Sequence, residues 1–405
     1  MVHRLSRLPP WGGALVVYAL SRVVSTILLA AMFWIATANG WRFASHRAHA
    51  TFFSFSGSWD ASSYRSIAEH GYPSTLPVDA AGHVLQNTWA FLPVYPYVVH
   101  ALTTVLGVNG TPNGFYAVGA IVSLVAGGVA AVLLSAILRR SIPAPRALFA
   151  VALFSLGPLG FLLQTAYAES LFLALLFASL WCLVARRYWL LIPFGVVAAF
   201  TRPGVLALSL ALGIHFVVRL RGRRITGSAF PWRDRLAIVV AAGLTAAAGL
   251  AWPVIASAAT RRPDAYLDTE LAFWTGFVGR RHFAPLTPWF AMATTYLGVV
   301  AGVVLVLLVI AAGVFWLTRR GTRALGADVV GLTASYWLYL VAVFLPQQSL
   351  PRLLLPTAPM LGSPVFWGPV SAGEAGSRRR RVALLVGCVV LQAVAIVFLW
   401  FVGYP

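Results

Sequence analysis

The sequence predicts an all-α polytopic membrane protein with about 11 transmembrane helices. Hydrophobic residues make up 60% of the chain and charged residues only 10%, far below the roughly 25% charged residues of soluble domains. Apolar stretches near the ~20 residues that cross a bilayer follow one another with short gaps. Arginines cluster between these stretches, as in multi-pass membrane proteins. The 405 residues (1–405) are therefore expected to form a single transmembrane domain.

The number of helices follows from the length of each apolar stretch. One stretch, 189–219, is too long for a single straight helix, and Arg202, Pro203 and Gly204 interrupt it, so we expect a pair of helices there. With that division the chain has 11 expected spans. The ten stretches are 12–38, 115–138, 147–164, 168–185, 189–219, 236–258, 290–317, 328–346, 352–369 and 382–402.

Segment 90–107 decides the orientation of the chain. If it crossed the membrane, Arg139, Arg140 and the run 378–381 would lie outside the cell, against the positive-inside rule. The segment also has prolines and tyrosines, which suit a short interfacial helix. We therefore expect a cytoplasmic N-terminus and two long non-cytoplasmic loops, 39–114 with interfacial helices and 259–289.

The charges narrow the classes of function. A net charge of +20 could indicate nucleic-acid binding, but the arginines lie in short clusters rather than on one basic face, so we expect no nucleic-acid partner. Acidic residues are few, and most of them fall on the predicted non-cytoplasmic side, so acid–base chemistry is expected there. These external acids are Asp60, Glu69, Asp79, Glu169, Asp264, Asp268 and Glu270.

Asp60 has two possible roles. The segment around it predicts a short helix with Asp60 at the N-cap, Gly71 at the C-terminal stop, and Tyr64 and Ile67 on one face. Aspartate is a favoured N-cap, so capping alone would account for it. Catalysis by an external carboxylate is the alternative.

Several motifs, in order along the chain, resemble the PIG-V-like mannosyltransferases of the GT-C superfamily. They are Trp59 and Asp60 with Tyr64, the segments 71–73 and 90–96, Ala166 to Phe172, Thr201 to Gly204, and more loosely 352–359. The composition and the small loops favour a bacterial member. The resemblance implies a GT-C type fold and a donor that is a polyprenyl-phosphate sugar, usually mannose. The acceptor would be a glycolipid or another glycan. The protein would be surrounded by membrane lipid.

The resemblance also implies a role for Asp60, and the chemistry of the leaving group with the predicted topology suggests roles for other residues. Asp60 would be the catalytic base of an inverting transfer. Arg202 and Arg352 are candidates for binding the lipid phosphate, although an arginine at a membrane edge can also simply snorkel. Glu169 could orient the acceptor or cap the next helix. Tyr167 is also expected to bind the substrate.

Other features leave alternatives open. Trp59 and Tyr64 could form a platform for the sugar or act as interfacial anchors. The charged segment 261–270 could bind an anionic headgroup or be a solvated loop. Histidines at 46, 49, 70 and 83 lack the spacing of a helical metal motif, so we expect no metal and no cofactor.

Two rival functions remain at this point. A GT-C transferase for another polyprenyl-phosphate sugar, such as arabinofuranose or glucose, would use the same residues. A lipid or glycolipid transporter would suit the broken helices near Arg202 but would not need Asp60 in an external loop.

Overall fold

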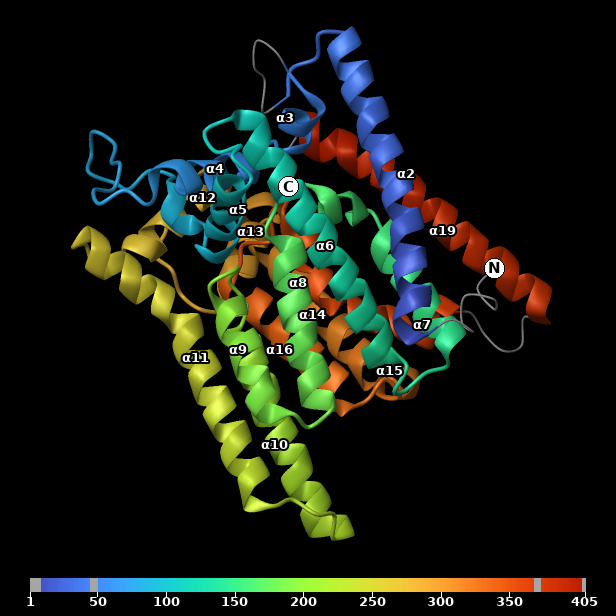
Figure 1. Ribbon diagram of the computed structural model, residues 1–405. Helices are drawn as coiled ribbons and strands as arrows, with labels where there is room; N and C mark the ends of the chain where they lie inside the picture. Colours follow the sequence, from blue (N-terminus) through green and yellow to red (C-terminus); the bar gives the residue numbers. More distant parts are fainter. Residues whose placement is uncertain (1–8, 44–49, 368–372, 403–405) are drawn as a thin grey trace.

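The described chain is built of α-helices with short 3₁₀ and π segments, so the predicted all-α class is confirmed (Figure 1). The computed structural model describes residues 9–43, 50–367 and 373–402. Within these ranges the only extended pairing is an isolated bridge between Val78 and Val84. The N-terminal segment 1–8, which the sequence predicts to be cytoplasmic, lies outside the described residues.

Five helices are long and apolar enough to cross a membrane, which supports a membrane protein. Four further apolar helices are shorter. The total of 11 spans stays a prediction. The five long helices are α2 (Pro10–Ala38), α6 (Pro112–Leu138), α11 (Trp232–Thr260), α14 (Val299–Thr318) and α19 (Gly373–Val397). The shorter ones are α7 (Ala144–Leu156), α8 (Glu169–Val184), α9 (Tyr188–Ala199) and α16 (Ala327–Val343).

Three expected spans are not continuous helices. The stretch 147–164 divides into α7 and the 3₁₀ segment η2 (Gly160–Gln164), with a break at Gly157. The stretch 290–317 divides into α13 (Pro288–Leu297) and α14 at Gly298, whose φ of 78° interrupts the helix. The prediction of one continuous helix at 352–369 is wrong over residues 352–367, because the prolines of this stretch remove helical hydrogen bonds. Residues 368 and 369 lie outside the described ranges. That stretch instead holds α17 (Leu350–Leu353), the 3₁₀ segment η3 (Leu355–Gly362) and α18 (Pro364–Trp367).

Helix α8 lies at the centre of the bundle. Most of its residues are buried, and it packs against α6 and α9. A helix that is apolar on every side lies in a protein core or in a bilayer, and the burial of α8 is consistent with its composition. The expected pair of helices at 189–219 is also present, as α9 and α10 (Leu206–Thr226) with a turn between them.

Short helices collect at one end of the bundle. The predicted first loop holds α3 (Phe52–Ser56), α4 (Asp60–His70), η1 (Thr88–Ala90) and α5 (Val94–Val105), and the second holds α12 (Ala265–Val278). Figure 1 shows α3, α4, α5 and α12 at this end, while the turn between α10 and α11 extends to the opposite one. At 12 residues, α5 is too short to span a bilayer.

Arg22 donates hydrogen bonds to backbone carbonyl groups at a break between two helical segments. It lies on α2, is 6% exposed, and donates hydrogen bonds to the backbone oxygens of Gly160 (2.6 Å) and Ser155 (2.5 Å). These oxygens lie where α7 gives way to the 3₁₀ segment η2 (Gly160–Gln164), so they lack regular helical partners. Gln392 of α19 donates to the oxygen of Gly157 in the same break (2.8 Å). Non-helical backbone within an apolar bundle needs such partners.

Arg22→Met is therefore expected to lower stability by about 2 kcal/mol, because it removes charge-assisted hydrogen bonds to buried carbonyl groups. Thermal unfolding of the detergent-solubilised chain measures the effect. Arg42→Met, at an exposed position just beyond the same helix, is the control and should leave unfolding unchanged. Equal unfolding of the two variants would contradict the role given to Arg22.

Candidate functional site

A tight turn places Asp60 at the start of α4. Trp59 immediately before it has φ 59° and ψ −119°, an uncommon conformation for a bulky residue. Gly57 passes so close to Tyr116 that an added Cβ would lie 2.3 Å from the ring. The Tyr167 hydroxyl donates to the backbone oxygen of Ser58 at 2.8 Å. Strain that is held by its surroundings in this way is common at functional sites.

The carboxylate of Asp60 binds an arginine rather than the end of its own helix. Trp59 takes the N-cap position, and no side-chain cap bond is found at this end of α4 within the described chain, so the expectation that Asp60 caps the helix is wrong. Its Oδ2 instead accepts a hydrogen bond from Nη1 of Arg352, about 290 residues later in the chain. The helix still ends at Gly71, as the sequence predicts.

Glu169 connects the two arginines. Its Oε1 accepts from Nη1 of Arg352 at 3.2 Å and from Nη1 of Arg202. The carboxyl side chain is 3% exposed, and Asp60 and Arg352 are 18% and 12% exposed. The four residues thus form a chain of ion pairs, which we call the charge cluster: Asp60, Arg352, Glu169 and Arg202. Two positive and two negative groups make its formal charge zero.

The break between α9 and α10 brings Arg202 into the charge cluster. The chain turns at Thr201 to Val205, and Gly204 has φ 129°. A Cβ at Gly204 would lie 2.9 Å from the ring of Tyr336, so glycine is needed there for both its backbone angle and the close contact. Glu169 is the first residue of α8, and its carboxylate serves the arginines instead of capping that helix.

Two polar atoms of the charge cluster are left for a ligand. Nε of Arg352 and Oε2 of Glu169 are buried and have no hydrogen-bond partner among the residues that the structure describes. Buried polar groups are nearly always paired, so an unpaired donor and an unpaired acceptor in one site need an explanation. A bound substrate with anionic oxygens and hydroxyl groups would satisfy both.

Electrostatics keeps Arg352 charged. Its guanidinium donates hydrogen bonds to the carboxylates of both Asp60 and Glu169, which favour the charged form. The cation is therefore available to stabilise negative charge at any physiological pH.

The aromatic residues around the cluster are mostly covered. Tyr64 is 3% exposed, with its ring against Phe91 (5.3 Å between centroids) and Tyr95 (5.2 Å). Tyr167 is buried beside Trp400. Their faces are packed inside the protein, so Tyr64 and Tyr167 line and position the site. Trp59 keeps part of its side chain exposed.

Glu270 is a member of the site that the sequence analysis did not single out. It lies on α12, accepts a hydrogen bond from the Tyr266 hydroxyl, and is close enough to interact electrostatically with Arg202, Asp60 and Arg352. Burial raises the pKa of its carboxyl to about 7, an effect that the two arginines only partly offset. The segment 261–270 is therefore not simply a solvated loop, because its end forms part of this helix.

Three other acids of the predicted non-cytoplasmic side form ion pairs apart from the cluster. Glu69 pairs with Arg65 at 2.7 Å, and Asp268 pairs with Arg262 at 3.4 Å. Asp79 binds Arg280 at 2.5 Å. Over the described ranges, no group of three or more potential metal ligands is found, and the histidines at 46 and 49 lie outside those ranges.

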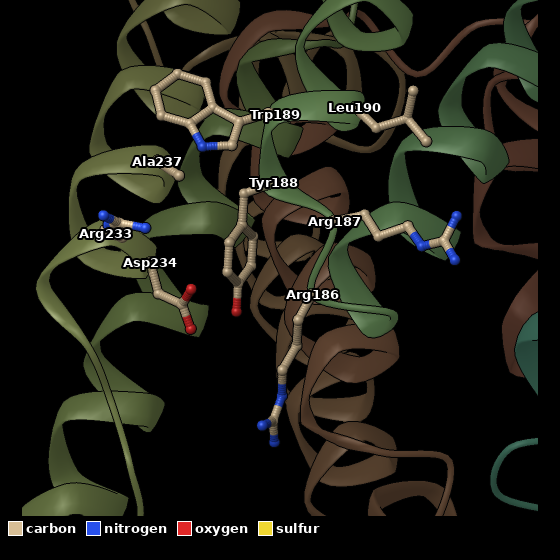
Figure 2. A pocket seen from close by; sticks show the side chains of 8 residues that line it. All are labelled: Arg186, Arg187, Tyr188, Trp189, Leu190, Arg233, Asp234 and Ala237. Atoms are coloured by element: carbon tan, nitrogen blue, oxygen red, sulfur yellow. The ribbon is translucent and has the colours of Figure 1, made fainter.

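A charged pocket of about 290 Å³ lies at the junction of α9 and α11 (Figure 2). Its arginines, Arg186, Arg187 and Arg233, do not converge on one point in Figure 2. Asp234 in its wall pairs with Arg219 at 3.8 Å. The charge cluster, where opposite charges converge and atoms remain unpaired, is therefore the better candidate for chemistry.

In comparisons with known proteins, no family model and no curated protein matches this sequence.

Proposed function

We propose that the protein is an inverting glycosyltransferase. It moves a mannosyl residue from a polyprenyl-phosphate donor to a lipid-linked or cell-envelope acceptor at the non-cytoplasmic face of the membrane. The observation that carries the proposal is the charge cluster, in which Asp60, Glu169, Arg202 and Arg352 meet from four distant parts of the chain. The resemblance to PIG-V-like mannosyltransferases supports the role of Asp60 as the base.

The reaction needs a base for the acceptor hydroxyl and positive charge for the leaving phosphate. The acceptor oxygen attacks the anomeric carbon, and its proton passes to the Asp60 carboxylate. The bond between the anomeric carbon and the phosphate oxygen breaks, and its electron pair leaves with the polyprenyl phosphate. Attack opposite the leaving group inverts the anomeric configuration.

The two arginines suit the leaving phosphate. Preorganised cations stabilise the charge that develops in the transition state, and a guanidinium can hold phosphate oxygens at two points. Arg352 still has its buried Nε–H to donate. Glu169 holds both arginines in place while leaving Oε2 for a substrate hydroxyl.

The test is transfer by the purified, reconstituted chain. Radiolabelled polyprenyl-phosphate mannose is supplied with a membrane-lipid extract, and labelled product is followed by chromatography. Parallel reactions use polyprenyl-phosphate glucose and arabinofuranose. Transfer of mannose alone supports the proposal, and transfer of another sugar retains the mechanism but changes the donor. Movement of intact donor across the bilayer, with no transfer from any of the three, would favour a transporter instead.

The raised pKa of the Glu270 carboxyl predicts that donor binding depends on pH. Below pH 7 its carboxyl is neutral and the site has no net formal charge; above pH 7 the site gains one negative charge. A unit charge on the order of 10 Å away, at an effective dielectric constant of about 20, costs an anionic ligand about 1.7 kcal/mol. The Kd for the donor is therefore expected to rise about tenfold from pH 6 to pH 8, and Glu270→Gln should abolish this rise.

Asp268→Asn is the matched control, since Asp268 lies on the same helix but pairs with Arg262. That variant should keep the pH dependence of the wild type. A pH profile that is the same in wild type and Glu270→Gln would show that Glu270 does not set the charge of the site.

A further inference from the structure

A second hollow, of about 580 Å³, lies beside the C-terminal half of α4, and we call it the α4 cavity. Its volume is within the range of small-molecule sites, about 300–1,000 Å³. Its lining residues, all within the described chain, include no arginine, aspartate or glutamate, so the cavity suits an uncharged ligand. The polar members of its wall are Ser66, His70, Tyr72, Thr75, Asn87 and Thr88.

Ring contacts and hydrogen bonds hold the wall of the α4 cavity. The ring of Tyr72 lies 4.6 Å from that of Trp89, and its hydroxyl donates to the backbone oxygen of Phe91 at 2.8 Å. The side chain of Asn87 donates to Thr269 on α12 and accepts from the backbone N–H of Trp89. These contacts fix an aromatic surface next to polar groups, which together suit the C–H faces and hydroxyls of a sugar.

Thr88 offers a specific contact. Its Oγ1 is buried and unpaired within the part of the chain that the structure describes. An unpaired hydroxyl in the wall of a cavity is a site at which a ligand hydroxyl can both donate and accept.

Helix α4 connects the cavity to Asp60. Asp60 is its first residue and His70 its last, so the two are about 15 Å apart along the axis at 1.5 Å per residue. Ser63 and Ser66 follow Asp60 in steps of three residues, which places neighbouring hydroxyls along the helix. A ligand that contacts both Asp60 and the cavity would therefore have to be about 15 Å long.

We propose that the α4 cavity binds a neutral sugar unit of the acceptor, remote from the hydroxyl that Asp60 activates. The acceptor is then an oligosaccharide chain, free or lipid-linked, rather than a single sugar. This inference rests on the proposed glycosyl transfer.

The test compares long and short acceptors. Ser66→Trp fills the α4 cavity, whereas Ala81→Trp, at an exposed residue of the same loop outside the cavity, is the control. Polyprenyl-phosphate mannose is the donor, with linear mannotriose or methyl mannoside as acceptor. Ser66→Trp is expected to raise the KM for mannotriose at least tenfold and to leave that for methyl mannoside unchanged. Ala81→Trp should change neither.

Thr88→Val is a second variant, and it is expected to fold like the wild type. Valine has the shape of threonine, and the substitution removes only an unpaired hydroxyl. It is expected to weaken binding of mannotriose several-fold, measured by saturation-transfer NMR on the full chain. Equal binding and equal KM in wild type, Ser66→Trp and Thr88→Val would overturn the inference even if transfer occurs. Binding that depends on Ser66 and Thr88, without any transfer, would support the cavity and refute the proposed function.

Discussion

Asp60→Asn is expected to reduce the rate of sugar transfer by about 10² to 10⁴-fold, the usual contribution of a general base. Asparagine keeps the shape of the side chain but cannot accept a proton from the acceptor hydroxyl. The affinity for the donor should change much less, because Arg202 and Arg352 remain. Steady-state kinetics with labelled polyprenyl-phosphate mannose separates kcat from KM and measures both effects.

Glu69→Gln is the matched control for this variant. Glu69 lies on the same helix α4 but pairs with Arg65 at the exposed surface. Its neutralisation should leave kcat within about twofold of the wild type, since exposed ion pairs contribute little. If Asp60→Asn transferred sugar as fast as Glu69→Gln, Asp60 would not be the base.

The central features of the site could be predicted from the sequence because they depend on topology. Glu169, Arg202 and Arg352 each stand at the edge of an apolar stretch, and all three edges fall on the side predicted for Asp60. Helix ends on one face of a bundle are close in space, and the structure joins these residues in ion pairs. The exact pairing, with Arg352 between two carboxylates, depends on packing that no local pattern reveals.

The contributions of Arg22 and Tyr167 could not be predicted because their partners are backbone oxygens. Arg22 binds the carbonyl groups of Ser155 and Gly160, and Tyr167 binds that of Ser58. Every residue has a carbonyl group, so side-chain identities do not show which one is left without a helical partner. A charge within an apolar stretch was nevertheless a signal that could have drawn attention to Arg22.

Glu270 was missed for a different reason. The sequence assigned 259–289 to a loop because its apolar runs are too short to span a membrane, yet α12 forms within it. Short helices are stabilised mainly by tertiary packing, which sequence patterns do not show. Here Phe273 of α12 packs against Phe91, which in turn contacts Tyr64. The helix, and with it Glu270, is held by aromatic contacts from the first loop.

Arg352→Ala is expected to reduce both stability and catalysis, because Arg352 is the only residue of the charge cluster that contacts both carboxylates. Removing one partner leaves the others partly buried without compensation, a loss of about 3 kcal/mol. The rate should fall by about 10² to 10³-fold, as when one preorganised donor to a developing charge is removed. Arg352→Lys should recover much of the stability but little of the rate, since lysine lacks the guanidinium fork.

Thermal unfolding and transfer kinetics measure these two effects, with Arg262→Ala as the control from an exposed ion pair. A double-mutant cycle then tests the pair itself. In Asp60→Asn/Arg352→Ala the unpaired carboxylate is gone, so the loss of stability should be smaller than the sum of the single losses by about 1–3 kcal/mol. Additive losses would mean that Asp60 and Arg352 do not interact, and Asp60 would then lack the cation that the structure places beside it.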